Sequence, residues 1–113
     1  MRAAYAGGTM PILAGRIAAT ARNQKALSEK IPDGPLAEFR RFYYDTANSG
    51  TKPIMSALMN LVPTSQILFG TDYPWVPAAS TVRDLAANTF PAEVMRAIDR
   101  DNALAILPRL RSA

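Results

Sequence analysis

The residues best placed for catalysis or metal binding are two aspartates, Asp45 and Asp72, which lie where short apolar segments end. Asp72 follows an apolar run at 67–69 and a Gly-Thr pair, and Pro74 closes the segment. Asp45 ends a second, aromatic run at 41–45. Both runs are typical of buried strands in a parallel sheet, and the carboxyl ends of such strands carry the chemistry in α/β folds. Because neighbouring strands lie about 5 Å apart, both carboxylates are expected to face one pocket, where they could hold a divalent cation or share acid–base work.

Other roles compete with chemistry at each candidate. Asp45 begins an Asp-Thr-Ala-Asn sequence that is typical of a turn or a helix cap, and we expect that role there in preference to catalysis. Asp72 precedes Tyr-Pro and has no evident capping duty, so we expect a metal ligand or a catalytic acid. Arg16 lies among apolar neighbours on a predicted helix. It either extends its charge to solvent along the surface or presents a guanidinium group to an anionic substrate.

The composition narrows the chemistry further. The 113 residues include no cysteine and no histidine. Without cysteine there are no disulfides or thiolate metal sites, which fits a reducing, cytoplasmic location. Without histidine the commonest general base is missing, and a zinc site within this chain would need carboxylates alone. The net charge of +4 comes from dispersed arginines, so we expect no nucleic-acid partner. No apolar stretch approaches the ~20 residues of a membrane span.

The remaining sequence reads as repeated units of strand, loop and helix. Strands are expected at 2–5, 41–45 and 67–69, and helices at 11–29, 53–61, 91–98 and 103–107. The first helix shows an apolar stripe made of Ile12, Leu13, Ile17, Ala21 and Leu27. Residues 71–80 are expected to form a long loop, and Asp101 to cap the last helix.

This alternation predicts an α/β fold with a parallel sheet. A closed (β/α)8 TIM barrel needs eight strands and about 250 residues. The chain is therefore expected to form about three βα units from the C-terminal part of such a barrel, incomplete on its own. All of 1–113 is then one partial domain.

Four segments carry a family resemblance, in the same order along the chain: 6–17, 42–47, 67–74 and 101–104. They resemble the C-terminal part of the amidohydrolase-related (amidohydrolase family 2) metal-dependent enzymes. The closest branch is similar to aminocarboxymuconate-semialdehyde decarboxylase and related nonoxidative aromatic-acid decarboxylases. The Gly-Thr-Asp-Tyr-Pro element and the Asp-Asn-Ala-Leu tail are the most specific parts of the match.

The resemblance implies a (β/α)8 barrel that binds one divalent metal, usually zinc, and a small carboxylated substrate. Family members hold the metal with a His-x-His pair on the first strand, a His on a middle strand and an Asp on the last strand, and Asp72 matches that Asp. The family's acid–base His falls at Tyr5 in this chain. Arg16 matches an arginine that meets a substrate carboxylate in the decarboxylase branch, a contact that can cross a dimer interface.

From these matches we expect the chain to be a fragment of a metal-dependent carboxy-lyase that acts on an aromatic or muconate-type acid, or a fragment of a related hydrolase. We expect it to be inactive and to bind metal weakly in isolation, because the family's His ligands are absent and a tyrosine with a pKa of about 10 is a poor base. The alternative is a non-catalytic remnant. It would act only by associating with a second copy, a full-length barrel or a complementary barrel chain through an exposed strand edge.

Overall fold

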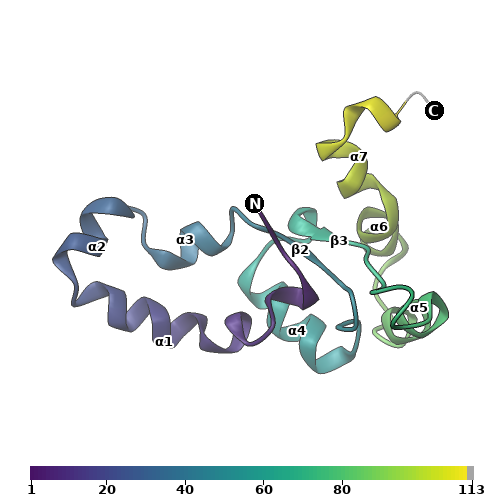
Figure 1. Cartoon of the computed structure of the whole chain (residues 1–113), viewed down its shortest axis with the longest axis horizontal. Coiled ribbons are helices and arrows are strands. Elements are labelled where there is room, and N and C mark those ends of the chain that lie inside the picture. Colours follow the sequence, from purple (N-terminus) through teal and green to yellow (C-terminus); the bar gives the residue numbers. More distant parts are fainter. Residues whose placement is uncertain (112–113) are drawn as a thin grey trace.

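A three-stranded parallel sheet lies at the centre of the computed structural model, which describes residues 1–111 (Figure 1). Strands β1 (Arg2–Ala3), β2 (Tyr43–Asp45) and β3 (Ile67–Leu68) are neighbours in chain order. Both pairings are parallel, and Asp45 lies opposite Leu68 in the second of them. The expected alternation of strand and helix and the α/β class are confirmed, although each strand is shorter than its pattern predicts.

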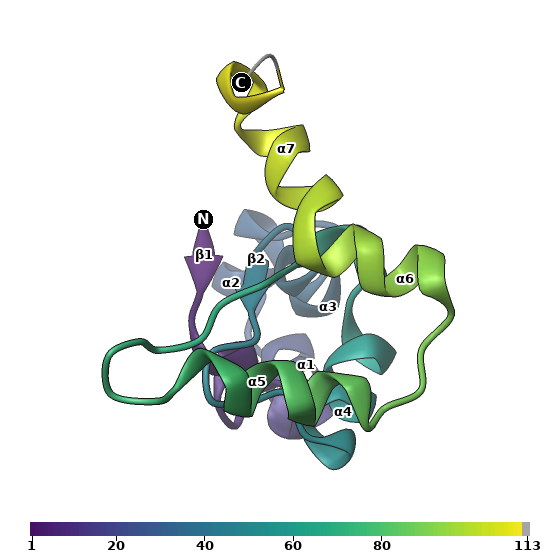
Figure 2. The same ribbon diagram turned by 90° about the vertical axis from the view of Figure 1, so that its right-hand side faces the viewer.

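Helices connect the strands and extend to both sides of the sheet (Figures 1 and 2). The connection from β1 to β2 contains α1 (Met10–Arg22), α2 (Lys25–Lys30) and α3 (Pro35–Phe39). The connection from β2 to β3 contains α4 (Lys52–Leu61). After β3 the chain forms α5 (Ala78–Ala86), α6 (Ala92–Arg96) and α7 (Asn102–Ile106). Short 3-10 turns form at Tyr5–Gly7, Thr64–Gln66 and Pro108–Leu110, and a π-helical turn at Ala97–Asp101 joins α6 to α7.

The shape is elongated, with principal extents of 46 × 32 × 28 Å and a radius of gyration of 15.4 Å. A compact domain of this length has a radius of gyration of about 13 Å. The difference arises because α1–α3 project from one side of the sheet and α5–α7 from the other (Figure 1). The fold is therefore open, with a small shared core.

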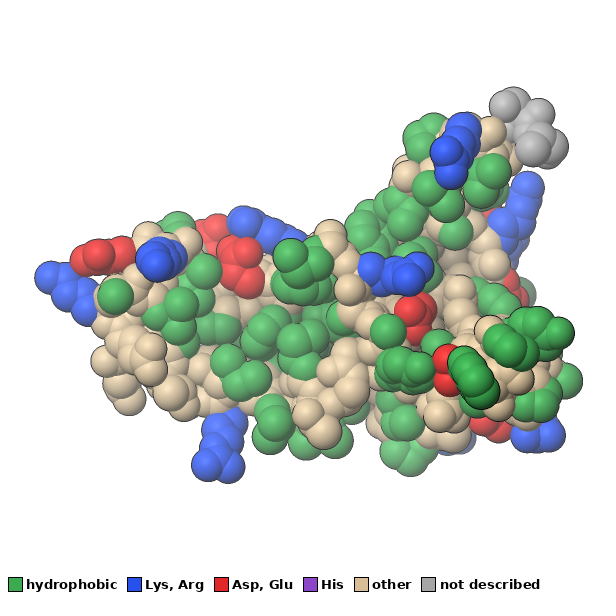
Figure 3. Space-filling model, viewed as in Figure 1, with side chains coloured by type: hydrophobic (Ala, Val, Ile, Leu, Met, Phe, Trp, Pro, Cys, Tyr) green, Lys and Arg blue, Asp and Glu red, His purple; other side chains and the backbone are tan. Residues whose placement is uncertain are grey.

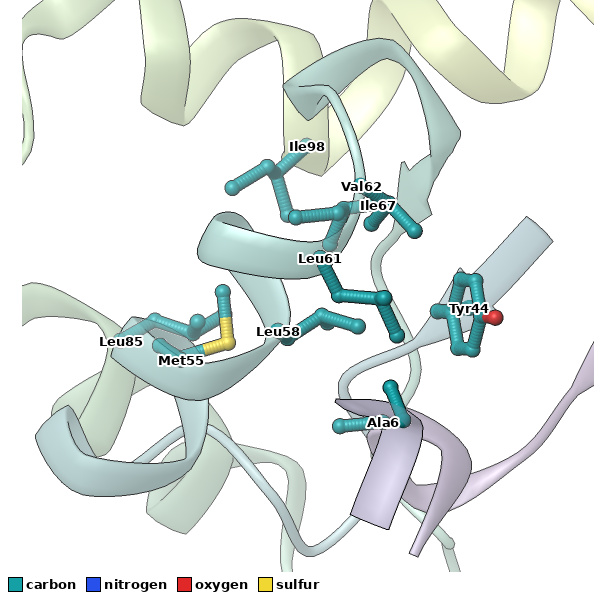
Figure 4. Packing of buried hydrophobic residues seen from close by; sticks show 10 residues of the cluster. Ala6, Tyr44, Met55, Leu58, Leu61, Val62, Ile67, Leu85 and Ile98 are labelled. Carbon is teal, nitrogen blue, oxygen red and sulfur yellow. The ribbon is translucent and has the colours of Figure 1, made fainter. Parts of the chain in front are cut away.

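That core gathers around α4, whose buried side chains follow a helical spacing. Met55, Leu58 and Leu61 lie on one face of the helix and are buried. They form a cluster with Tyr44 and Ile67 from the sheet, together with side chains from α5 and the π-helical turn (Figure 4). Burying each large apolar side chain stabilises the fold by about 1.5–3 kcal/mol. The sheet and the helices on both sides of it are thus joined through α4.

The first predicted helix differs from the structure in length and in the face that it buries. It ends at Arg22, and a separate helix, α2, begins at Lys25. The expected apolar stripe is largely exposed: the exposed fraction of Ile12 is 78%, and that of Leu13 is 41%. Ala21 from that stripe is buried, and so is Ala14 outside it, because small side chains let α1 approach α3 and α4 closely. Figure 3 shows the resulting hydrophobic side chains on the surface in the region of α1.

Three further expectations about helices are wrong. The loop expected at 71–80 ends early, because Pro77 is the N-cap residue of α5. A short helix, α3, forms after Gly34 where none was expected. Asp101 occupies the N-cap position of α7, but it has helical dihedral angles of −67° and −35° and its side chain makes no capping hydrogen bond within residues 1–111. Its carboxylate pairs with Arg96 at 3.2 Å instead. The π-helical turn joins α6 directly to α7, so the helical path continues through Asp101. Among residues 1–111, no helix is both long enough and apolar enough to span a bilayer.

Candidate active site

Tyr5 links the two strand-end aspartates that the sequence singles out. The Tyr5 hydroxyl donates a hydrogen bond to Asp72 Oδ1 at 3.0 Å, and the Tyr5 backbone N–H donates to Asp45 Oδ1, also at 3.0 Å. Residues far apart in the sequence thus meet at the carboxyl edge of the sheet. The expectation that both carboxylates face one region is supported, with Tyr5 between them.

The backbone at this edge adopts unusual dihedral angles. Tyr5, Ala6 and Asp72 all have positive φ, at 53°, 52° and 65°. Such angles are uncommon for residues other than glycine and often occur at functional sites. In Tyr5 and Ala6 they turn the chain sharply between β1 and α1. The positive φ of Asp72 lies in the loop that follows β3, where the carboxylate meets the Tyr5 hydroxyl.

The Asp45 carboxylate makes hydrogen bonds that stabilise the local backbone. Its side chain is buried, and Oδ1 accepts hydrogen bonds from the backbone N–H groups of Tyr5 and Ala47, the second at 3.2 Å. Its other oxygen, Oδ2, lies 3.9 Å from Arg2 Nε. The bond to Ala47, two residues ahead, is the Asx-turn contact expected of an aspartate in a turn. The turn interpretation of Asp45 is therefore favoured over the catalytic one.

The chemistry of Tyr5 is that of a hydrogen-bond donor. Its pKa is raised above the ordinary value, first by the hydrogen bond to Asp72 and next by the negative charge of that carboxylate. The phenol consequently keeps its proton at neutral pH. This supports the expectation that Tyr5 is a poor general base and leaves it available to hold or deliver a proton.

A complete metal site is not present within residues 1–111. They contain no group of three His, Cys, Asp or Glu side chains that could hold a metal ion. Of the two aspartates, Asp45 has its oxygens occupied by backbone N–H groups and the nearby Arg2, whereas Asp72 is only partly buried and accepts one hydrogen bond. The residues described thus offer Asp72 as a single ligand and do not fit a metal by themselves.

Arg16 lies away from the Tyr5–Asp72 pair. Its side chain is exposed on α1 and lines a hollow of about 370 Å³ with Leu13, Ile17 and Leu27. Neither Tyr5 nor Asp72 lines this hollow. The structure therefore brings together two of the three expected site residues, Tyr5 and Asp72, whereas Arg16 lines a hollow that neither of them reaches.

Sequence reasoning missed Thr46, which follows Asp45 at the end of β2. Its hydroxyl donates to Gly70 O at 3.0 Å and accepts from Gly70 N–H at 3.1 Å. Thr46 is fully buried. A side chain at position 70 would begin only 3.1 Å from Asp45 Cβ, so the close approach of these segments favours glycine. The available signal was a hydroxyl residue next to a strand-end aspartate, together with a glycine that follows the neighbouring strand.

Comparisons with known proteins give one consistent family. Residues 21–109 match the family model described as "Amidohydrolase", a family in which metal dependence is typical. The 6-methylsalicylic acid decarboxylase of Penicillium expansum is 35% identical over 111 residues, covering 95% of this chain and 34% of that protein. The chain thus spans about a third of the length of this relative.

Solved structures of decarboxylases share the fold. The 5-carboxyvanillate decarboxylase LigW from Sphingomonas paucimobilis aligns with a TM-score of 0.78 and 18% identity, over 95% of this chain and 33% of that one. A dihydroxybenzoic acid decarboxylase from Polaromonas sp. JS666, with bound manganese and the inhibitor 2-nitroresorcinol, aligns with a TM-score of 0.77 and 17% identity, over 97% of this chain and 34% of that one. The three-stranded sheet and its helices therefore match about a third of a TIM-barrel decarboxylase fold.

Proposed function

Because the chain belongs to the amidohydrolase family, we propose that it supplies the C-terminal third of a metal-dependent carboxy-lyase barrel that acts on a small aromatic carboxylic acid. One observation carries the proposal: the Tyr5 hydroxyl meets the Asp72 carboxylate at 3.0 Å on the edge of the sheet where this family does its chemistry. The 35% identity to a 6-methylsalicylic acid decarboxylase supports this substrate class.

Within such a barrel, Asp72 is the proposed ligand to the divalent metal, zinc or manganese. The other ligands come from the remaining two-thirds of the barrel, because the residues described here do not form a metal site. A metal bound by one carboxylate keeps most of its water ligands. The chain alone is accordingly proposed to bind metal weakly and to be inactive.

The reaction replaces a carboxyl group on an aromatic ring by hydrogen. The carbon–carbon bond to the carboxylate breaks, its electron pair stays on the ring carbon, and a proton adds there as CO2 leaves. Tyr5 is the proposed holder of that proton.

The substrate carboxylate is proposed to bind Arg16. The exposed position of Arg16 on α1 supports a contact that forms only when a second copy or a complementary barrel chain packs against this helix. A planar guanidinium group suits a carboxylate because it can donate two parallel hydrogen bonds. A cytoplasmic location is the proposed setting, supported by the cysteine-free composition.

Fragment complementation tests this function. The chain is co-expressed with the part of the Penicillium expansum decarboxylase that lies outside the matched third, and CO2 release from 6-methylsalicylic acid is measured with added Mn2+ or Zn2+. We expect release from the complex, its loss on chelation, and none from either part alone. CO2 release by the isolated chain would contradict the assignment of ligands to both parts. A stable, metal-loaded complex without release would favour the non-catalytic remnant.

A further inference from the structure

Two adjacent residues at the end of β2 hold the two segments that carry the Tyr5–Asp72 pair. Asp45 accepts a hydrogen bond from the backbone N–H of Tyr5, and Thr46 makes two hydrogen bonds with the backbone of Gly70. Gly70 lies two residues before Asp72. The middle strand therefore fixes the Tyr5 segment through one side chain and the Asp72 segment through the next.

We propose that Asp45 and Thr46 are positioning residues for the Tyr5–Asp72 pair, an inference that rests on the proposed function of that pair. Neither side chain contacts the hydroxyl–carboxylate bond directly. They set the distance across the sheet edge, so that the Tyr5 hydroxyl reaches Asp72 Oδ1 at 3.0 Å.

Burial supports this role. Thr46 is fully buried and Asp45 is 8% exposed, whereas Tyr5 is 44% exposed. Hydrogen bonds shielded from water persist, while an exposed pair on its own is easily replaced by bonds to solvent. The exposed Tyr5–Asp72 contact thus depends on the buried bonds beneath it. Ala6 and Tyr44 are also fully buried beside it, which restricts movement of the turn after β1.

A matched pair of variants separates positioning from general stability. Thr46→Val removes both bonds to Gly70 and keeps the shape of the side chain. Thr81→Val makes the same change on α5, where the buried hydroxyl has no hydrogen-bond partner among residues 1–111. Thr46→Ser keeps a hydroxyl and is the rescue variant. Circular dichroism checks that each variant is folded.

The readout is the ring 13Cζ resonance of Tyr5 in the full chain, labelled at tyrosine and assigned with Tyr5→Phe. Asp72→Ala defines the chemical shift of the unpaired hydroxyl. We expect Thr46→Val to move the Tyr5 resonance most of the way toward that shift, and Thr46→Ser and Thr81→Val to leave it unchanged. Backbone hydrogen exchange at Gly70 should accelerate on the order of tenfold in Thr46→Val only. A folded Thr46→Val protein with the wild-type Tyr5 resonance overturns the proposal.

If Thr46→Val does not fold, two variants of Asp45 provide the test. Asp45→Asn keeps an oxygen that accepts from the Tyr5 and Ala47 N–H groups, whereas Asp45→Ala removes it. The proposal expects the Tyr5 resonance to shift in Asp45→Ala and to stay in Asp45→Asn, and equal behaviour of the two overturns it. Because this readout needs no turnover, an inactive complemented barrel would refute the proposed function without affecting this result.

Discussion

Replacing Asn102 by alanine should weaken the fold by more than its small volume indicates. Asn102 is buried at the start of α7, and its Nδ2 donates to Thr64 O at 2.7 Å and to Ile67 O at 2.8 Å. One side chain thus ties the C-terminal helix to the outer edge of β3. Each bond contributes about 1 kcal/mol net, and the Ile67 carbonyl that loses its Asn102 donor adds to the cost, whereas Thr64 O still accepts from the Ile67 N–H. We therefore expect Asn102→Ala to lower the free energy of unfolding by about 2–3 kcal/mol.

Asn60→Ala is the matched control. The Asn60 side chain also donates to a backbone oxygen, that of Ser56 at 2.8 Å, but it lies on the exposed face of α4. Both substitutions place alanine in a helical segment, so the gain in helix propensity is similar. Solvent replaces the lost bond at Asn60, and the change there should stay within about 0.5 kcal/mol.

Urea unfolding followed by far-ultraviolet circular dichroism measures both variants. The prediction is a lower midpoint for Asn102→Ala with an unchanged slope, and nearly the wild-type curve for Asn60→Ala. If the two variants unfold at the same urea concentration, the buried amide does not anchor β3, and the reasoning from its two bonds is refuted.

Three further predictions concern the backbone turn after β1 and the tyrosines. Gly7→Ala should lower the free energy of unfolding by about 1–3 kcal/mol, because φ is +79° and the new Cβ would lie 2.9 Å from Tyr44 Cε1. Gly15→Ala, in open space within α1, should raise that free energy by about 0.5–1 kcal/mol. Thermal unfolding measures both variants. Burial raises the pKa of Tyr44. The Tyr44 contribution to stability is therefore full below the unfolded pKa of about 10 and declines as pH rises toward the folded pKa. Denaturation curves at alkaline pH should show a smaller loss of stability for Tyr44→Phe than for the wild type, and an equally steep loss would contradict this. Asp72→Asn should lower the pKa of Tyr5 in an NMR titration, since the Asp72 hydrogen bond and charge raise it, and no change would count against the contact.

The strand ends were predictable from the sequence, but the contacts between them were not. Apolar runs followed by Asp45 and Asp72 located the carboxyl edge of the sheet correctly. The Tyr5–Asp72 bond depends on positive φ angles at Tyr5 and Ala6, and such angles are rare for these residue types. Local sequence therefore does not indicate them, since tertiary contacts such as the Asp45 bond to the Tyr5 N–H hold them in place.

For the helices, the sequence pattern did not reveal which face is buried or where every helix begins. The stripe of large residues on α1 has the correct period, but periodicity does not reveal which face meets the core. Ala14 and Ala21 are buried because α1 packs closely on α3 and α4, an arrangement set by the whole fold. α5 was missed because it buries only Thr81 and Leu85, too few to give an apolar pattern. Pro77 falls in the loop expected at 71–80, and no helix was expected at Pro35, whereas each proline lies at a helix start.

The most direct test of the central claim is the rate of CO2 release by the complemented barrel with Asp72 changed to Asn. Asp33→Asn is the control, because Asp33 is exposed and, within residues 1–111, pairs only with Arg41, at 3.5 Å. We predict metal-dependent release from 6-methylsalicylic acid with the wild-type and Asp33→Asn chains, and a fall of at least tenfold together with lower metal content for Asp72→Asn. Equal rates and equal metal content for all three chains would contradict the account.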